Sequence, residues 1–177
     1  MRKIFPASHD RKMLIITVLA IIFMLAVALF TFLPAYNTWR TAACPLLPFP
    51  LPNTVPAILV LLIIIGCRLF APEAFEITDS SLIIRRPLFS PRIALQSVTT
   101  ARMLEAAEMK NSARLFGVGG LFGSYGCFRN KSLGRYLMYA TKTTGFVLVE
   151  ADGKKFALTP DQPETFIAEL RAACKLK

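Results

Sequence analysis

Charged side chains are nearly absent from the first third of the sequence. Between Met13 and Cys67 the only one is that of Arg40. An uncharged stretch of this length is not typical of a water-soluble protein, and it points first to a membrane. The charges elsewhere in the chain are mostly basic, and the formal net charge is +10.

Histidine and cysteine are scarce as well. The chain has one histidine, His9, and four cysteines that stand far apart, Cys44, Cys67, Cys127 and Cys174. Zinc sites and disulfide frameworks need such residues at short, regular spacings. We therefore expect no metal site and no cofactor-binding site.

Catalysis would have to depend on a few carboxylates. Glu105 and Glu108 lie three residues apart in a segment that we expect to be helical, where one solvated face accounts for them. Asp152 lies in a predicted turn, where aspartate is common, and Glu150 is the fourth candidate. One histidine near the N-terminus cannot complete a nucleophile–base pair with them. We expect the protein not to be an enzyme.

Two apolar runs are candidate transmembrane helices. The run 13–33 has 21 residues without a charge, and a helix of that length rises about 30 Å, the hydrocarbon thickness of a bilayer. It is too long for the apolar core of a cleaved signal peptide. The run 55–70 just reaches membrane length, with Arg68 able to extend its charged end toward the interface.

The loops predict the orientation of this hairpin. Residues 34–54 form a proline-rich connector with a single charge, which we expect on the outer side. Basic residues flank the other ends of both runs, namely Arg2, Lys3, Arg11, Lys12 and Arg68. The positive-inside rule therefore predicts a multi-pass anchor over 1–70, with both termini and a domain over 71–177 in the cytoplasm.

Residues 71–177 have the composition of an ordinary domain, and short strands are predicted along it. The expected strands cover 74–78, 81–86, 91–95, 97–104, 135–142, 145–151 and 154–159. The last three are expected to be consecutive and antiparallel. Asp79–Ser80 and Asp152–Gly153 supply tight turns.

The periodicity changes to helical after residue 160. Asp161 is the expected N-cap, with Glu164 three residues later as in a capping box. Phe166, Ile167, Leu170 and Cys174 share one apolar face. Short strands followed by one amphipathic helix predict a small β-sandwich or barrel with the helix packed over an open end.

The stretch RLFGVGGLFGSYGCF, residues 114–128, has five glycines among aromatic residues. It lacks the third glycine of a dinucleotide-binding loop, and Tyr125 and Asn130 occupy the glycine positions of a P-loop. We interpret its glycines as structural, allowing positive φ and close backbone approach while phenylalanines fill the core. They are Gly117, Gly119, Gly120, Gly123 and Gly126.

Four segments together resemble the bacterial pleckstrin-homology (PH)-like domain membrane proteins. They are FEITDSSLIIRRP (75–87), the glycine stretch, LGRYLMYATK (133–142) and GFVLVEADGKKFALTPDQPETFIAEL (145–170). The resemblance covers nearly all of 72–174. It implies about seven antiparallel strands in a partly open barrel or sandwich capped by the C-terminal helix, and no catalytic activity. The loop 78–81 is short and has no cation, so the phosphoinositide site of eukaryotic relatives is not carried over.

The expected function is that of an interaction module at the inner face of the bacterial inner membrane. It would bind anionic lipid head groups or a protein partner, including another copy of itself, and we expect no nucleic-acid partner. Candidate contacts with an anionic surface are Arg85, Arg86, Arg92, Arg129, Lys131 and Arg135; a solvated basic face is the alternative for them. A structural or accessory subunit of a membrane complex is the alternative function.

Overall fold

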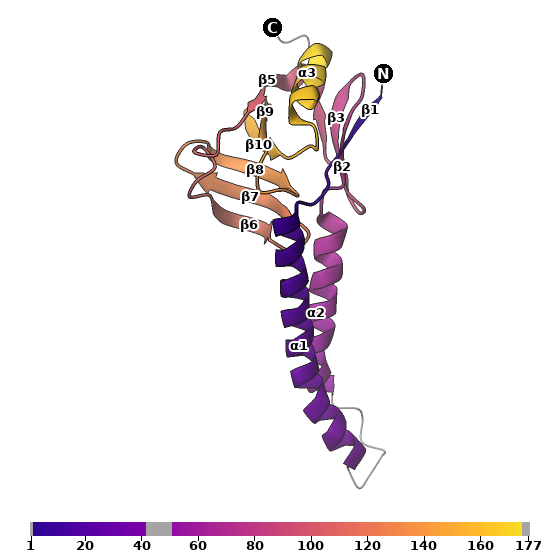
Figure 1. Ribbon diagram of the computed structural model, residues 1–177. Helices are drawn as coiled ribbons and strands as arrows, with labels where there is room; N and C mark the ends of the chain where they lie inside the picture. Colours follow the sequence, from indigo (N-terminus) through magenta and orange to yellow (C-terminus); the bar gives the residue numbers. More distant parts are fainter. Residues whose placement is uncertain (1, 42–50, 175–177) are drawn as a thin grey trace.

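The computed structural model describes residues 2–41 and 51–174. Two helices, α1 (Arg11–Thr41) and α2 (Leu51–Phe70), lie side by side and project from a β-domain (Figure 1). The β-domain contains two sheets and the C-terminal helix α3 (Pro163–Cys174). One long apolar helix near the N-terminus and a β-domain with a C-terminal helix therefore agree with the expectations from the sequence.

The first sheet is antiparallel and has the strand order β1-β2-β3-β4. Its strands are β1 (Lys3–Pro6), β2 (Ala74–Ile77), β3 (Ser81–Arg85) and β4 (Arg92–Ala94). A short 3-10 helix, η1 (Leu95–Ser97), leads from β4 to the second sheet.

The second sheet has the order β5-β9-β10-β8-β7-β6. Its strands are β5 (Val98–Met103), β6 (Ala113–Gly119), β7 (Ser124–Asn130), β8 (Gly134–Ala140), β9 (Val147–Ala151) and β10 (Lys154–Leu158). The two sheets are not closed into a barrel in the described part of the chain.

This strand arrangement differs from the predicted one. The described residues hold ten strands rather than about seven, because β1, β6 and β7 were not expected as strands. The last three strands of the chain, β8, β9 and β10, also do not lie in the sheet in their order along the chain. β10 lies between β9 and β8 and is parallel to β8. After β8 the chain crosses to form β9, which pairs with the distant β5, and then returns as β10 between β9 and β8. Local periodicity does not encode this order.

The predicted turns are present. Thr78 to Ser80 connect β2 to β3. Asp152 and Gly153 connect β9 to β10, and both have positive φ, 51° and 69°. Positive φ at both central residues is the geometry of the two-residue turn that matches the twist of a hairpin.

The main core lies between the two sheets under α3. Phe166 and Leu170 of α3 are fully buried there, and Ile167 and Cys174 pack against the same core, as the helical spacing predicts. The predicted N-cap is wrong, because α3 begins at Pro163 and Asp161 binds elsewhere. Proline is well suited to a first helical position, where its missing N–H is not needed.

Strand β1 comes from the part of the chain that the sequence assigns to the membrane anchor. It pairs with β2, and its Phe5 is buried with the ring edge-on to Phe166 at 5.2 Å between centroids. Pro6 is tolerated because β1 is the edge strand, so one missing N–H breaks no central ladder. Residues before α1 therefore complete the β-domain.

Two carboxylates fasten the segment between β1 and α1. Asp161 accepts hydrogen bonds from the backbone N–H of Ser8 at 3.1 Å and from its hydroxyl at 2.6 Å. Asp10 caps α1 through the N–H of Met13 at 2.7 Å and also accepts the N–H and hydroxyl of Thr143. Burial by itself raises the pKa of Asp10. The hydrogen bonds from Thr143 and Met13 together lower the pKa by more than burial raises it, so the pKa is below its ordinary value.

The first turns of α1 also contact the β6–β7 turn. The Thr17 hydroxyl donates to the carbonyl oxygen of Gly120 at 3.0 Å and accepts the N–H of Phe122 at 3.1 Å. The His9 ring nitrogen Nε2 lies 3.0 Å from the Phe122 carbonyl oxygen. The helices are therefore held in a defined position on the β-domain.

The two helices extend beyond the predicted spans. α1 continues through Pro34 to Thr41, and α2 begins at Leu51. The proposed connector 34–54 is thus helical at both ends, and its residues 42–50 lie outside the described part of the chain. By length and composition, one described helix qualifies to cross a bilayer, over Arg11–Pro34, whereas the apolar part of α2, Val55–Phe70, is shorter.

The glycine stretch forms β6, a turn and β7. Gly117 and Gly126 face each other in the ladder, and both have positive φ, 118° and 127°. Gly120 and Gly123 also have positive φ, whereas Gly119 does not. Four of the five glycines therefore have a positive φ, the geometry that the interpretation invokes. The expected role of the phenylalanines is only partly correct, because Phe128 is buried but Phe116 is 81% exposed.

Candidate functional site

A large cavity lies where α2 meets β6. We call it the α2–β6 groove. It has a volume of about 780 Å³, within the range of small-molecule sites. Its apolar walls are formed by Ile63, Cys67 and Phe70 of α2 and by Leu115 and Phe116 of β6.

Tyr125 of β7 joins the two walls of the groove. Its hydroxyl donates to the carbonyl oxygen of Cys67 in the last turn of α2. The last carbonyl groups of a helix have no partner within the helix, so this bond satisfies one of them. Burial raises the pKa of the Tyr125 hydroxyl, which stays protonated and able to donate. The geometry of the groove is therefore set by a bond between the helix and the sheet.

Arg86 is the first of two cations in the groove. Its guanidinium carbon lies 5.4 Å from the ring centroid of Tyr139, 5.7 Å from that of Phe70 and 5.8 Å from that of Phe89. Its Nε donates to the Phe89 carbonyl oxygen at 2.6 Å. Within the described residues it has no carboxylate partner. Burial lowers the pKa of Arg86, although a guanidinium remains charged at neutral pH.

Arg114 of β6 is the second cation that lines the groove, and it too has no carboxylate partner within the described residues. No acidic side chain is among the groove's lining residues. Tyr139, from β8, is 8% exposed, and its hydroxyl has no hydrogen-bond partner in the described part of the chain. The groove thus combines apolar walls with guanidinium and hydroxyl donors that are not used up inside the protein.

Gly66 leaves the helical wall of the groove open. A Cβ atom added there would meet nothing within 4 Å. Gly66 is one turn before Phe70 and faces the same cavity. The absence of a side chain at this position therefore contributes to the volume of the groove.

The structure does not bring the six predicted basic residues together. Arg86 lies in the groove. Arg85 lies 3.5 Å from Glu76, a buried carboxylate that also pairs with Arg2, so its charge is balanced. Arg92 is on β4. The other three, Arg129, Lys131 and Arg135, cluster around the β7–β8 turn, at the end of β7 away from α1.

Arg114 was not among the predicted contacts, and neither were the exposed apolar residues beside the cations. Leu115 and Phe116 belong to a stretch whose aromatic residues were expected in the core. Leu88 and Phe89, in the β3–β4 loop, are also exposed. Their exposure depends on which strand lies at the sheet edge, and no local sequence signal marks that.

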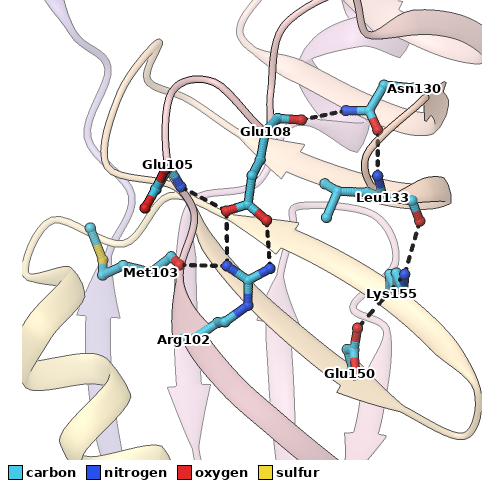
Figure 2. A network of polar contacts seen from close by, with 8 residues as sticks. All are labelled: Arg102, Met103, Glu105, Glu108, Asn130, Leu133, Glu150 and Lys155. Atoms are coloured by element: carbon cyan, nitrogen blue, oxygen red, sulfur yellow. Dashed lines mark hydrogen bonds and ion pairs between the residues drawn. The ribbon is translucent and has the colours of Figure 1, made fainter.

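The carboxylates considered for catalysis belong largely to a structural network. In Figure 2 the Glu108 carboxylate accepts two hydrogen bonds from Arg102, at 2.6 and 2.8 Å, and one from the backbone N–H of Glu105 at 3.0 Å. This segment forms turns rather than the predicted helix. Glu105 and Glu108 therefore do not share a solvated helical face.

The network continues across the β7–β8 turn. The Asn130 side chain donates to the Glu108 carbonyl oxygen at 2.8 Å and accepts the N–H of Leu133 at 2.7 Å. Lys155 donates to the Leu133 carbonyl oxygen at 3.0 Å and lies 3.9 Å from Glu150. These contacts hold the loop that covers the second apolar cluster, which includes Leu104 and Tyr136 among others.

The Arg102–Glu108 pair predicts an acid-dependent loss of stability. Hydrogen bonds from Arg102 and from the backbone of Glu105 lower the pKa of Glu108 from 4.5 to about 2. A depressed pKa in the folded state stabilises the fold fully above pH 4.5 and loses this effect as the pH falls toward 2. Glu108→Gln should therefore be less stable than wild type at neutral pH, and the difference should shrink between pH 4.5 and 2. Unfolding curves of both proteins across this range test it; a difference that does not change with pH would contradict it.

No group of three or more histidine, cysteine, aspartate or glutamate side chains that could hold a metal ion occurs among residues 2–41 and 51–174. Cys67, Cys127 and Cys174 are free thiols.

Two sheets that carry a C-terminal helix over their shared core define the class of protein as a PH-like β-domain. A family model described as "Bacterial PH domain" matches residues 73–174, more than half of the chain, and the chain belongs to this family. Neither curated proteins nor solved structures gave a significant match.

Proposed function

We propose that the protein is a membrane-anchored, non-enzymatic interaction module of the bacterial inner membrane. α1 and α2 cross the bilayer, both termini are cytoplasmic, and the PH-like domain lies at the inner face, where it contacts anionic lipid head groups. The observation that carries the proposal is the apolar and uncovered surface of α1.

The exposed apolar side chains of α1 would be in an unfavourable environment in water. Phe23 is 70% exposed and Phe30 is 80% exposed, with leucine, isoleucine and valine side chains exposed around them. A continuous apolar surface of this kind needs a partner or a bilayer to cover it. The apolar segment of α1, Arg11–Pro34, has 24 residues and rises about 36 Å, enough to cross the hydrocarbon layer.

Charge supports the orientation. Arg11 and Lys12 precede the apolar part of α1, and Arg68 ends α2, so these cations lie at the domain end of the hairpin. The opposite end has only Arg40. Positive charge collects on the cytoplasmic side of membrane proteins.

The β-domain also offers a surface suited to the bilayer interface. The β3–β4 loop touches the end of α2, where the N–H of Leu88 donates to the Leu69 carbonyl oxygen at 3.2 Å. Leu88 and Phe89 are exposed beside Arg86. Apolar tips next to a cation suit the boundary between acyl chains and anionic head groups.

Fractionation of bacterial cells that express the full chain with a C-terminal tag tests the anchor. We expect the protein to stay in the membrane pellet after a carbonate wash, and the tag to be digested by protease in inside-out vesicles but not in spheroplasts. Release by carbonate would contradict the anchor, and digestion in intact spheroplasts would contradict the orientation.

A protein partner is the second candidate, and strand β6 favours it. Within the described residues β6 pairs on one side only, with β7, and Leu115 and Phe116 are exposed on it. An open edge of this kind accepts a strand from another chain, whether a second copy or another membrane subunit.

The substitution Leu115→Lys tests this candidate. If the protein assembles through β6, the variant should lose the assembly that light scattering detects for the wild type in detergent. An unchanged mass would exclude this edge.

A further inference from the structure

We propose that the α2–β6 groove binds one anionic phospholipid, with its phosphate at Arg86 and Arg114 and one acyl chain along α2 past Gly66. This inference rests on the proposed membrane anchor, because the lipid would enter the groove from the surrounding bilayer.

The cations of the groove define the charge of the ligand. Arg86 and Arg114 have no carboxylate partner within the described residues, and no acidic residue lines the groove. Arg86 uses one of its N–H groups on the Phe89 carbonyl oxygen, so most of its donors remain. A guanidinium binds phosphate oxygens in a fork geometry, and such charge-assisted bonds are the strongest hydrogen bonds in proteins.

Tyr139 adds a neutral donor beside Arg86. Its ring packs under the guanidinium at 5.4 Å and its hydroxyl has no hydrogen-bond partner among the described residues. A buried hydroxyl without a partner costs free energy, and a phosphate or ester oxygen would satisfy it. Two guanidinium groups and a phenol therefore line one groove, a donor set that suits an anion with several acceptor oxygens.

The remaining walls define the rest of the ligand. Ile63, Phe70, Leu115 and Phe116 present hydrocarbon, and the gap at Gly66 leaves space between them. The lining stretch of α2, from residue 63 to residue 70, rises about 10 Å toward the β-domain. A free inorganic anion would not explain this apolar channel, whereas an amphiphile whose chain continues along α2 into the bilayer would.

Native mass spectrometry of the delipidated full chain in detergent tests the proposal. Dioleoylphosphatidylglycerol is titrated against dioleoylphosphatidylcholine, which has the same chains and no net charge. We expect one bound phosphatidylglycerol with at least about tenfold tighter binding than phosphatidylcholine, because two guanidinium groups repel the choline cation of phosphatidylcholine. Equal binding of both lipids, or many weak adducts without saturation, would overturn the proposal.

Three variants locate the site. Arg86→Gln and Arg114→Gln should each weaken phosphatidylglycerol binding about tenfold and narrow its advantage over phosphatidylcholine, whose choline cation each arginine repels. Gly66→Leu should weaken binding of both lipids, because it fills the channel without touching a charge. Arg114 and Gly66 keep the proposal testable should Arg86→Gln fail to fold, since Arg114 lies on an exposed strand and a Cβ atom at Gly66 meets nothing within 4 Å.

Two matched controls make the same kinds of change outside the groove. Arg129→Gln removes a cation at the far end of β7, and Leu62→Phe adds bulk on an exposed part of α2 that does not line the groove. Both should bind as wild type does, and a loss in either would overturn the assignment to the groove. A lipid-free dimer that Gly66→Leu dissociates would show a second copy in the groove and overturn it as well.

The carbonate wash on the same protein distinguishes a failure of the lipid site from a failure of the anchor. A chain that stays in the membrane but shows no preference for phosphatidylglycerol would overturn the lipid site alone. A chain that carbonate releases would overturn the anchor on which the site rests.

Discussion

Replacement of Gly126 by alanine is expected to lower the free energy of unfolding of the β-domain by about 3 to 5 kcal/mol. A Cβ atom there would lie 2.3 Å from the carbonyl oxygen of Phe116 and 2.7 Å from the Cα of Gly117. Both are backbone atoms of β6, which cannot move away without breaking the β6–β7 ladder. The φ of 127° at Gly126 is also one that residues with a side chain rarely adopt.

Glycines on the two neighbouring strands, β6 and β8, offer matched controls for this effect. Gly119→Ala places a Cβ atom 3.4 Å from the end of the flexible Arg114 side chain at a residue without positive φ, so little change is expected. Gly134→Ala retains a positive φ of 72° but meets nothing within 4 Å, so it should cost about 1 kcal/mol. Pulse proteolysis of the full chain in detergent and increasing urea measures all three. Equal losses for Gly126 and Gly134 would show that backbone strain alone, and not the close approach of the strands, requires the glycine.

Replacement of Phe5 by alanine is the second change with a large expected effect, about 3 to 5 kcal/mol. Phe5 comes from the N-terminal segment, yet it is 7% exposed and packs edge-on to Phe166 of α3. Phe75 of β2 contacts the same Phe166 ring at 6.0 Å between centroids. The alanine variant would leave a cavity where β1, β2 and α3 meet, and the loss of contacts on its walls adds to the lost burial.

Ile4 provides the control on the same strand. Its side chain points to the opposite face and is 49% exposed, so Ile4→Ala should change the free energy of unfolding by no more than about 0.5 to 1 kcal/mol. The same proteolysis assay compares the two variants. Similar small effects of both would mean that β1 is dispensable and that a domain beginning near residue 71 is complete. A large effect of Phe5 alone would mean that such a fragment lacks part of its own core.

Local sequence patterns were sufficient for several elements. The absence of charge from Met13 to Cys67, apart from Arg40, predicts the apolar helices because a helix in a bilayer needs little more than length and apolar side chains. The spacing of Phe166 and Leu170 predicts the buried face of α3. Asp152–Gly153 predicts its turn because few dipeptides adopt positive φ twice in succession. The resemblance to bacterial PH-like domains was confirmed by the family match.

The helix boundaries were less predictable. The first apolar span was expected to end at residue 33, but the helix passes Pro34 and reaches Thr41. Asp161 was expected to cap α3, but it binds Ser8, which is more than 150 residues away in sequence. For Asp161 a local preference for the N-cap was overridden by a contact that the local sequence does not contain.

The sequence by itself determined where the chain is apolar, where it turns and which family it belongs to, because these depend on neighbouring residues. Only the tertiary structure decided that β1 joins β2, that β10 lies between β8 and β9, and that Gly66, Arg86 and Arg114 line one groove. Strand order and the meeting of distant side chains depend on long-range packing. The six basic residues chosen from charge alone could not be sorted into paired, remote and groove-lining ones without it.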